Sequence, residues 1–419
     1  MSEQETLLRA ASVAGDAIDF PYRDRQGNAP SYTYKVPANL HYLYIVGCGG
    51  SGRHATGADS GGPGGGGIIQ ALVPVVPGET LSIFVGDGAG EGWQGRSGYR
   101  PGGDGGKAPR AHPPNGGGGG GSTAVVDATG RVLIHAAGGG GCGGRGELDG
   151  IQGGTGGTGG LNPENGTPGQ SREFSQGGHG GLGGDTRRTD RGGAGDGEHT
   201  GGGGGGGGGG LYCGDGGGAG YGDNGGGGGG GGSGASDIIA SAIGVVESHQ
   251  EPVVGYVKVY PDKSTVDSSV ASSAFKYVFL RMDGTGVTQQ NPTGGVVNCQ
   301  YTGKGHYEHF IVRPQPDGTV AIESEQFPDV FLRMDGTGLS REKPMDSGVV
   351  NCQYGPGALT YFRIVAHLEG SLAIESVAFP GVFLGMDGTG VTQFLPNGGG
   401  RVYCRFGADR QEAFRMLGV

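Results

Sequence analysis

The chain has 419 residues, of which 106 are glycine, and its formal net charge is −11. A chain of this length accommodates two or three domains with cores of their own. The acidic balance argues against nucleic-acid binding by counterion release and against a basic membrane-surface helix. No segment reaches the roughly 18 apolar residues that a membrane-spanning helix requires.

Glycine is distributed unevenly, because 84 of the 106 glycines precede residue 268. This shift places a domain boundary near residues 264–269, and the polar stretch 263–267 is expected to be a linker. The first residues lack the basic start and long apolar run of a signal peptide. We therefore expect synthesis in the cytoplasm, with non-classical release left open, and we treat residues 1–29 as an N-terminal leader segment.

Residues 30–262 are predicted to form a glycine-rich β-sandwich. Short runs between the glycines alternate polar and apolar residues or are continuously apolar, as strands are. The runs are 31–36, 41–46, 68–73, 80–85, 123–127, 131–135 and 255–260.

Long glycine tracts lie between these runs, above all 201–210 and 225–232. Such tracts provide no apolar core, and a helix would fix the flexible glycine backbone at every residue. Two outcomes remain: disorder, or extended helices of the polyproline-II type that pack closely and hydrogen-bond to one another. Because strands leave and re-enter the glycine region, we expect ordered, polyglycine-II-like tracts.

A series of motifs keeps a specific order through residues 30–261. They are Tyr34-Lys-Val-Pro, His41–Val46 followed by Gly47-Cys-Gly-Gly, Pro77–Gly88, Ala136-Ala-Gly-Gly-Gly-Gly and Gly255–Tyr260. This order resembles a glycine-rich domain of bacterial surface proteins, phage tail adhesins and some animal receptors. The resemblance implies surface binding or scaffolding without catalysis.

Two glycine motifs have known counterparts in cofactor and metal sites. Gly47–Gly52 fits G-x-G-x-x-G after a strand, but the glycine run 61–67 follows where a dinucleotide-binding helix would have to begin. Gly180–Asp185 fits the start of a calcium β-roll repeat, which needs tandem copies to stack its ligands. The sequence therefore predicts no cofactor, no metal site and no catalytic residues, so the protein is not expected to be an enzyme.

Residues 268–419 contain three repeats of about 52 residues. The string Val-Phe-Leu-Arg-Met-Asp-Gly-Thr-Gly begins at Val278 and at Val330, and it returns at Val382 with glycine in place of arginine. Each repeat reads as four short strands, and such a unit cannot bury its apolar face alone. We predict a twelve-stranded β-trefoil, in which residues 268–272 supply the strand that the third repeat lacks.

Within the second repeat, three stretches carry a family resemblance: Asn351–Gly357, Tyr361–Gly370 and Leu372–Ser376. They are similar to strings of the fascin-like trefoils. Members of that family bind actin filaments, and related trefoils bind glycans or receptors. Ricin-type trefoils rely on Gln-x-Trp motifs, whereas the only tryptophan here is Trp93.

The repeats place one aspartate at equivalent positions, namely Asp283, Asp335 and Asp387. Arg281 and Arg333 precede two of them, so a threefold site would be imperfect. One interpretation is that aspartate and glycine shape a hairpin turn, with glycine supplying a positive φ. The other is a set of three ligand pockets, in which aspartate accepts hydrogen bonds from sugar hydroxyls.

Six cysteines show no C-x-x-C pair and are expected to be free thiols. Cys299, Cys352 and Cys404 follow the repeat, and we expect them inside the barrel as small apolar residues.

Together these features predict a non-enzymatic, lectin-like or adhesive protein. Its trefoil would bind a cell-surface glycan or glycoprotein receptor, and the glycine-rich domain would be a scaffold or a second binding face. Two alternatives remain: an insecticidal or other cell-targeting toxin, and an actin-binding or self-assembling structural protein. A homo-oligomer is compatible with each, while nucleic acid and a transmembrane segment are not expected.

Overall fold

The structure is a computed structural model of the whole chain. It describes residues 17–23, 30–55, 61–107, 115–146, 151–171, 176–184, 192–193, 195, 202–221, 230–232, 234–249, 253–263, 265–302, 305–345 and 347–419. Most of the predicted leader and most of the glycine tract 225–232 lie outside these residues. Within them the protein is all-β, and its helical elements are four short 3-10 turns. No helix of the described residues has the length and apolar character needed to cross a membrane.

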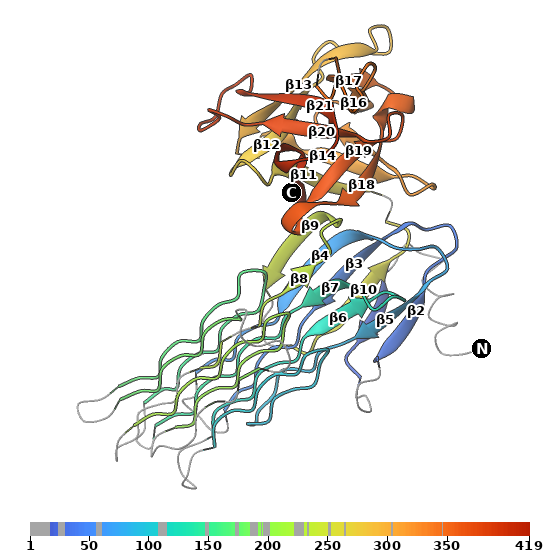
Figure 1. Cartoon of the computed structure of the whole chain (residues 1–419). Helices are drawn as coiled ribbons and strands as arrows, with labels where there is room; N and C mark the ends of the chain where they lie inside the picture. The colour runs from blue at the N-terminus through green and yellow to red at the C-terminus, as the bar shows by residue number, and fades with distance from the viewer. Residues whose placement is uncertain are drawn as a thin grey trace.

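Ten strands of the N-terminal part form two five-stranded antiparallel sheets (Figure 1). The first sheet has the order β1 (Ile18–Pro21), β10 (Tyr256–Tyr260), β3 (Tyr42–Cys48), β4 (Gly67–Pro74) and β9 (Ile243–His249). The second has the order β2 (Tyr32–Lys35), β5 (Thr80–Phe84), β6 (Thr123–Val126), β7 (Val132–Ala136) and β8 (Asp237–Ile238). Strand β1 lies within the predicted leader, and the sequence did not predict β8 or β9.

Strand β3 is buried on both faces. Side chains alternate along a strand, so Leu43 and Ile45 enter one apolar cluster while Tyr42, Tyr44 and Val46 enter another. The first cluster fills the space between the two sheets. The second is continuous with the core of residues 266–418, so the two parts of the chain share buried apolar surface.

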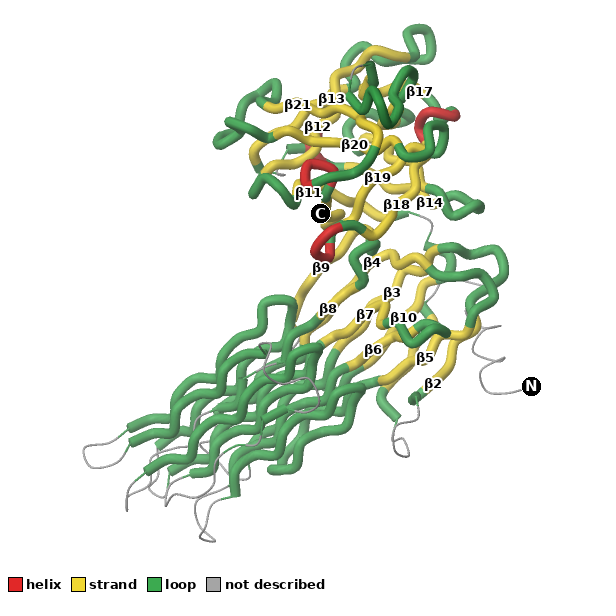
Figure 2. The backbone as a smooth tube through the Cα atoms, viewed as in Figure 1, coloured by secondary structure: helices red, strands yellow, loops and turns green. Residues whose placement is uncertain are grey.

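The glycine tracts continue from the strands as extended chains that lie side by side (Figure 2). The tract 138–144 donates its amides to three neighbouring chains with a period of three residues. Residues 138, 141 and 144 donate to 203–209, residues 139 and 142 to 50–53, and residues 140 and 143 to 154–157. Its carbonyls accept from three further chains, through the amides of Gly64, of Gly117 and Gly120, and of Gly231 and Gly234. Three residues per turn is the repeat of a polyproline-II helix. The amides and the carbonyls of the tract each reach three neighbouring chains, which makes six neighbours in all.

Close packing is the reason why this region needs glycine. A Cβ atom added to Gly141 would lie 2.1 Å from the carbonyl oxygen of Gly117, and one added to Gly139 would lie 2.1 Å from that of Gly64. These oxygens belong to backbone that is itself hydrogen-bonded, so they cannot move away without breaking other bonds. At these positions the close packing therefore leaves no room for a side chain.

Twelve strands make up the C-terminal part. They are β11 (Val266–Ser272), β12 (Val278–Asp283), β13 (Thr293–Tyr301), β14 (Phe310–Pro314), β15 (Val320–Ser324), β16 (Val330–Asp335), β17 (Val349–Tyr354), β18 (Tyr361–Ala366), β19 (Leu372–Ser376), β20 (Val382–Asp387), β21 (Gly400–Phe406) and β22 (Phe414–Gly418). Residue 264 of the predicted linker lies outside the described residues, and residues 266 and 267 belong to β11.

Six of these strands close into a ring, with the order β11, β14, β15, β18, β19, β22 and back to β11. The other six form the hairpins β12–β13, β16–β17 and β20–β21. Each hairpin joins the ring through one strand, β11, β15 or β19. Inside the ring, the repeated residues Phe310, Phe362 and Phe414 have no exposed surface.

The three repeated cysteines lie on the hairpins, not in the ring where we had expected them. Each thiol faces a main-chain carbonyl of the neighbouring hairpin: Cys299 Sγ is 3.5 Å from Asp387 O, Cys352 Sγ 3.7 Å from Asp283 O, and Cys404 Sγ 3.5 Å from Asp335 O. All three are buried free thiols, as predicted. A thiol fits here because it is small and donates weakly to a carbonyl.

These thiols are expected to resist alkylation in the folded protein. Burial raises the pKa of Cys352 to about 12, so the reactive thiolate is scarce at neutral pH. Iodoacetamide treatment followed by peptide mass spectrometry should show slow modification of Cys299, Cys352 and Cys404 in the native chain and fast modification in denaturant. Equal rates in the two states would contradict this placement.

The hairpin loops correct the interpretation of the Asp-Gly pairs. The loops span residues 284–292, 336–348 and 388–399, so none is a two-residue turn. Positive φ occurs at the second glycine of the motif, as at Gly286 with φ 81°, and not at Gly284. Gly284 is required for space, because a Cβ there would lie 2.8 Å from the ring of Phe327.

The two parts of the chain meet at the end of the ring opposite the hairpins (Figure 1). Strand β22 pairs in parallel with β9 through Leu417 and Val245. The Tyr42 hydroxyl donates to the carbonyl of Gly318, in the loop between β14 and β15, at 3.4 Å. This contact leaves the hairpins at the far end of the molecule.

Candidate functional site

The three repeated aspartates each end the first strand of a hairpin. In every case Oδ1 accepts a hydrogen bond from the backbone amide two residues later, at 3.1 Å for Asp283 and Asp335 and 3.0 Å for Asp387. The hydroxyl of Thr337 also donates to Oδ1 of Asp335 at 2.6 Å, and this bond is the main reason why the pKa of Asp335 lies below its ordinary value. These carboxylates are ionised and hold the start of each loop.

The two arginines are engaged by groups of the protein. Arg281 is buried, and its Nη2 atom lies 3.2 Å from both Asp283 Oδ2 and the carbonyl of Pro396. Its guanidinium also stacks on the ring of Tyr307 at 4.6 Å. Arg333 is half-buried and donates to Asp335 Oδ2 at 2.8 Å. The structure thus brings each arginine to the aspartate of its own repeat.

The third repeat differs because a tyrosine fills the space of the arginine. Gly385 faces Tyr403 across the hairpin, and a Cβ on Gly385 would lie 2.5 Å from the tyrosine ring. The Tyr403 hydroxyl donates to Glu412 Oε1 at 2.9 Å. The imperfect threefold symmetry that the sequence indicated therefore has a packing cause.

An open pocket lies elsewhere, beside the loop between β18 and β19. We call it the Arg410 pocket. It has a volume of about 280 Å³ and is lined by Ser273, Ala274, Leu368, Ser371, Arg410, Ala413 and Arg415. Arg410 belongs to the 3-10 turn η4 (Arg410–Glu412), and both arginines are exposed. The lining combines two cationic groups, two hydroxyls and an apolar floor.

A second pocket, which we call the Tyr361 pocket, lies beside the loop between β14 and β15. It has a volume of about 260 Å³ and is lined by Gln315, Pro316, Asp317, Thr319 and Tyr361. The Thr319 hydroxyl donates to Asp317 Oδ1 at 2.7 Å and is the main reason why the pKa of Asp317 is lowered. An ionised carboxylate, an amide and an aromatic ring therefore meet at one surface.

The two pockets occupy equivalent places in the repeats. Thr319 and Ser371 are 52 residues apart, and so are Tyr361 and Ala413. Sequence reasoning missed both pockets because it followed the residues that repeat, whereas most of the lining differs between repeats. The only sequence signal was the Asp317-Gly-Thr turn between two predicted strands.

One group of side chains has the composition of a metal site, although the sequence predicted none. Within the described residues, His306, His309 and Glu325 bring their ligand atoms within 4.8 Å of one another. Asp283, Asp335 and Asp387, by contrast, belong to three different hairpins, and each accepts a hydrogen bond from the threonine two residues later. Asp283 and Asp335 also accept from Arg281 and Arg333.

Comparison with known proteins gives no family for the chain. No protein-family model matches it, and no curated protein matches it. The resemblances to a glycine-rich surface domain and to fascin-like trefoils therefore stay predictions.

Several solved structures are distantly similar to the chain. A mosquitocidal holotoxin has a TM-score of 0.30 at 9% identity, and the match covers 38% of this chain and 17% of the toxin. A Polyporus squamosus lectin, solved with a human-type influenza-binding epitope, has a TM-score of 0.26 at 14% identity over 37% of this chain and 49% of the lectin. An endo-β-galactosidase from Clostridium perfringens has a TM-score of 0.26 at 7% identity over 95% of this chain and 75% of that enzyme. Scores this low support no argument about function.

Proposed function

We propose that the protein is a non-enzymatic, lectin-like or adhesive protein that binds cell-surface glycans. In this proposal residues 268–419 are a twelve-stranded β-trefoil, and residues 30–262 are a glycine-rich β-sandwich with polyglycine-II-like tracts. Because β11 begins at Val266, the link between them is shorter than the predicted 263–267. Two features support the trefoil. Six strands form a closed ring, and three hairpins joined to that ring recur about every 52 residues in the sequence.

The pair of equivalent pockets carries the functional proposal. A sugar offers hydroxyls for hydrogen bonding and an apolar ring face for stacking, and binding sites use a few convergent polar groups beside apolar surface. The Tyr361 pocket supplies an aromatic ring with Asp317 and Gln315 beside it. The Arg410 pocket has two guanidinium groups, which suit the carboxylate or sulfate of an acidic sugar.

The repeated aspartates are a second proposed set of ligands. The side chains of Asp283 and Asp335 remain 25% and 26% exposed despite their pairing with Arg281 and Arg333, so a sugar hydroxyl can reach them. The pockets are the stronger candidates, because they are concave and hold aromatic or apolar surface beside the polar groups.

The glycine-rich part is proposed to act as a scaffold. The tract 138–144 bonds to six neighbouring chains, and such a network is stiff because each chain is held from all sides. A stiff extension on one side of the trefoil would hold the sugar-binding surface away from whatever the other end contacts.

Binding of labelled full-length protein to cultured animal cells tests this function. We expect binding that falls sharply when glycosidases strip the cell surface. Tyr361→Ala should weaken binding at least 10-fold, about 1.4 kcal/mol, because the stacking surface of one pocket is lost.

Phe394→Ala is the matched control, because Phe394 is an exposed aromatic residue, 58% exposed, outside both pockets. It should bind like the unmodified chain. Undiminished binding to deglycosylated cells would show a protein or lipid receptor and reject the sugar proposal. Equal binding by Tyr361→Ala would move the site to the Arg410 pocket, for which Arg410→Ala is the variant. Equal binding by that variant too would leave the hairpin aspartates, tested by Asp335→Ala.

A further inference from the structure

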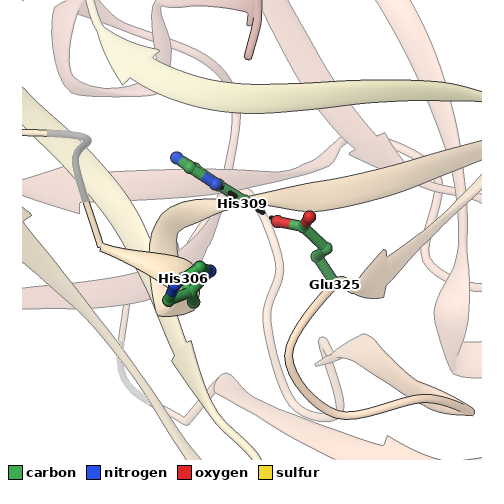
Figure 3. A group of neighbouring side chains, drawn as sticks. All are labelled: His306, His309 and Glu325. Carbon is green, nitrogen blue, oxygen red and sulfur yellow. Dashed lines mark hydrogen bonds and ion pairs between the residues drawn. The ribbon is translucent and has the colours of Figure 1, made fainter.

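The group of His306, His309 and Glu325 lies on the first repeat (Figure 3). None of the three lines either pocket. His309 Nδ1 lies 3.2 Å from Glu325 Oε2. The ring centroids of His306 and His309 are 6.2 Å apart. His306 and Glu325 are exposed and His309 is half-buried, so an ion has access from solvent.

The backbone fixes where these three side chains start. His306 begins the 3-10 turn η1 (His306–Glu308), and His309 caps its end. In a 3-10 helix, side chains three residues apart point in the same direction, which places the two imidazoles on one side. Glu325 is held beside them because its amide donates to the carbonyl of His309 at 3.1 Å.

The turn itself is anchored in the protein core. The ring of Tyr307 stacks on Phe327 at a centroid distance of 5.5 Å and an angle of 14°. The Arg281 guanidinium covers Tyr307, and its Nε atom lies 3.8 Å from Glu308. The residues between the two histidines are therefore held in place by contacts with Phe327 and Arg281.

Comparison of the repeats shows that the fold does not require this group. The same backbone bond recurs from Val377 to Tyr361 at 3.1 Å and from Ser273 to Ala413 at 2.9 Å. The turn recurs as η2 (Ala358–Thr360) and η4. The equivalent side chains are Ala358, Tyr361 and Val377 in one repeat and Arg410, Ala413 and Ser273 in the other. Only the first repeat places two imidazoles and a carboxylate here.

We propose that His306, His309 and Glu325 form a binding site for a divalent transition-metal ion of the Zn²⁺ class. Imidazole nitrogens and a carboxylate oxygen are ligands that zinc takes from proteins, and zinc commonly binds three protein ligands and one exchangeable molecule. The fourth position faces solvent and would accept water or an oxygen of a second molecule.

Calorimetric titration of the full chain with Zn²⁺ tests this site. The unmodified protein should bind one Zn²⁺ ion per chain at this site. His306→Ala and Glu325→Gln should each weaken the affinity for that ion at least 10-fold. His367→Ala is the control, because His367 is another imidazole of the same β-structure, engaged with the carbonyl of Asp409 at 2.9 Å. His367→Ala should leave the affinity for that Zn²⁺ ion unchanged. Unchanged binding in both site variants would overturn the proposal.

Crystals soaked in Zn²⁺ give a second, independent test. An anomalous difference peak between His306, His309 and Glu325 would support the site, and peaks only at other histidines would reject it. Because the three residues lie outside both sugar pockets, loss of zinc binding and loss of glycan binding are separate results.

Discussion

Replacement of Gly141 by alanine is expected to destabilise the N-terminal part by about 3 kcal/mol or more, because extra atoms in a close-packed interior force the backbone apart. The new Cβ would lie 2.1 Å from the carbonyl oxygen of Gly117. The backbone at Gly141 and at Gly117 is held by hydrogen bonds, so relief of the clash would break them. The amide of Gly141 donates to the carbonyl of Gly206, and the amide of Gly206 donates to the carbonyl of Gly117.

Trp93 gives a local signal for this experiment, since it is the only tryptophan of the chain. Its carbonyl accepts a hydrogen bond from Gly105 and its ring lies under the Lys107 ammonium at 3.8 Å, so it belongs to the glycine region. Urea unfolding followed by Trp93 fluorescence therefore reports on this part alone.

Gly62→Ala is the matched control, because a Cβ at Gly62 would meet no atom within 4 Å. It should unfold at nearly the same urea concentration as the unmodified chain. Equal midpoints for Gly141→Ala and Gly62→Ala would contradict the close packing of the tracts.

The N-terminal part is also expected to lose about 2 kcal/mol of stability between pH 7 and pH 5 through one buried histidine. His135 is 2% exposed, its Nε2 lies 2.8 Å from Ser122 Oγ, and the ring of Tyr99 packs against it at 5.2 Å. Burial, helped by the nearby Arg100, lowers the pKa of His135 from 6.5 to about 3. The folded imidazole thus stays neutral at pH 5, whereas the unfolded one takes up a proton.

The direction follows from proton binding. Below pH 6.5 the unfolded state binds more protons than the folded state. The free energy of unfolding therefore decreases as the pH is lowered, until the folded pKa of His135 is reached. His135→Gln should flatten this dependence by about 2 kcal/mol, as measured by urea unfolding at pH 7, 6 and 5. His54→Gln, at an exposed histidine, should keep the original slope. The same slope in His135→Gln would show that other groups cause the acid sensitivity.

Much of the strand content was predictable because its signal is local. Alternation in Val320–Ser324 and the 52-residue repeat predicted strands that appear as β15 and its equivalents. The prediction of an all-β protein is confirmed. Strand β1 was missed because four residues carry little pattern, and its partner β10 lies more than 230 residues away in the sequence.

Glycine positions show the limit of such reasoning most clearly. Gly284 and Gly286 stand two residues apart in the same motif, yet one is needed for space and the other for positive φ. In the tracts nearly every residue is glycine, so no local feature says which chains become neighbours. The register emerges only from the hydrogen bonds of the folded state.

The candidate site was partly predictable for a related reason. Asp335 and Arg333 were noticed because they repeat, and the structure pairs them. The residues that distinguish one repeat from another escaped notice. Arg410 and Tyr361 acquire their pocket neighbours only when the ring closes and brings distant loops together. His306 meets Glu325 across the hairpin of β14 and β15.

Glycan binding can be measured with a glycan array probed with the full-length protein. We predict binding to a set of related sugars, with acidic sugars among them because of Arg410 and Arg415, and competition by the free sugar. Failure to bind any glycan on an array that contains both neutral and acidic sugars would reject the proposed function.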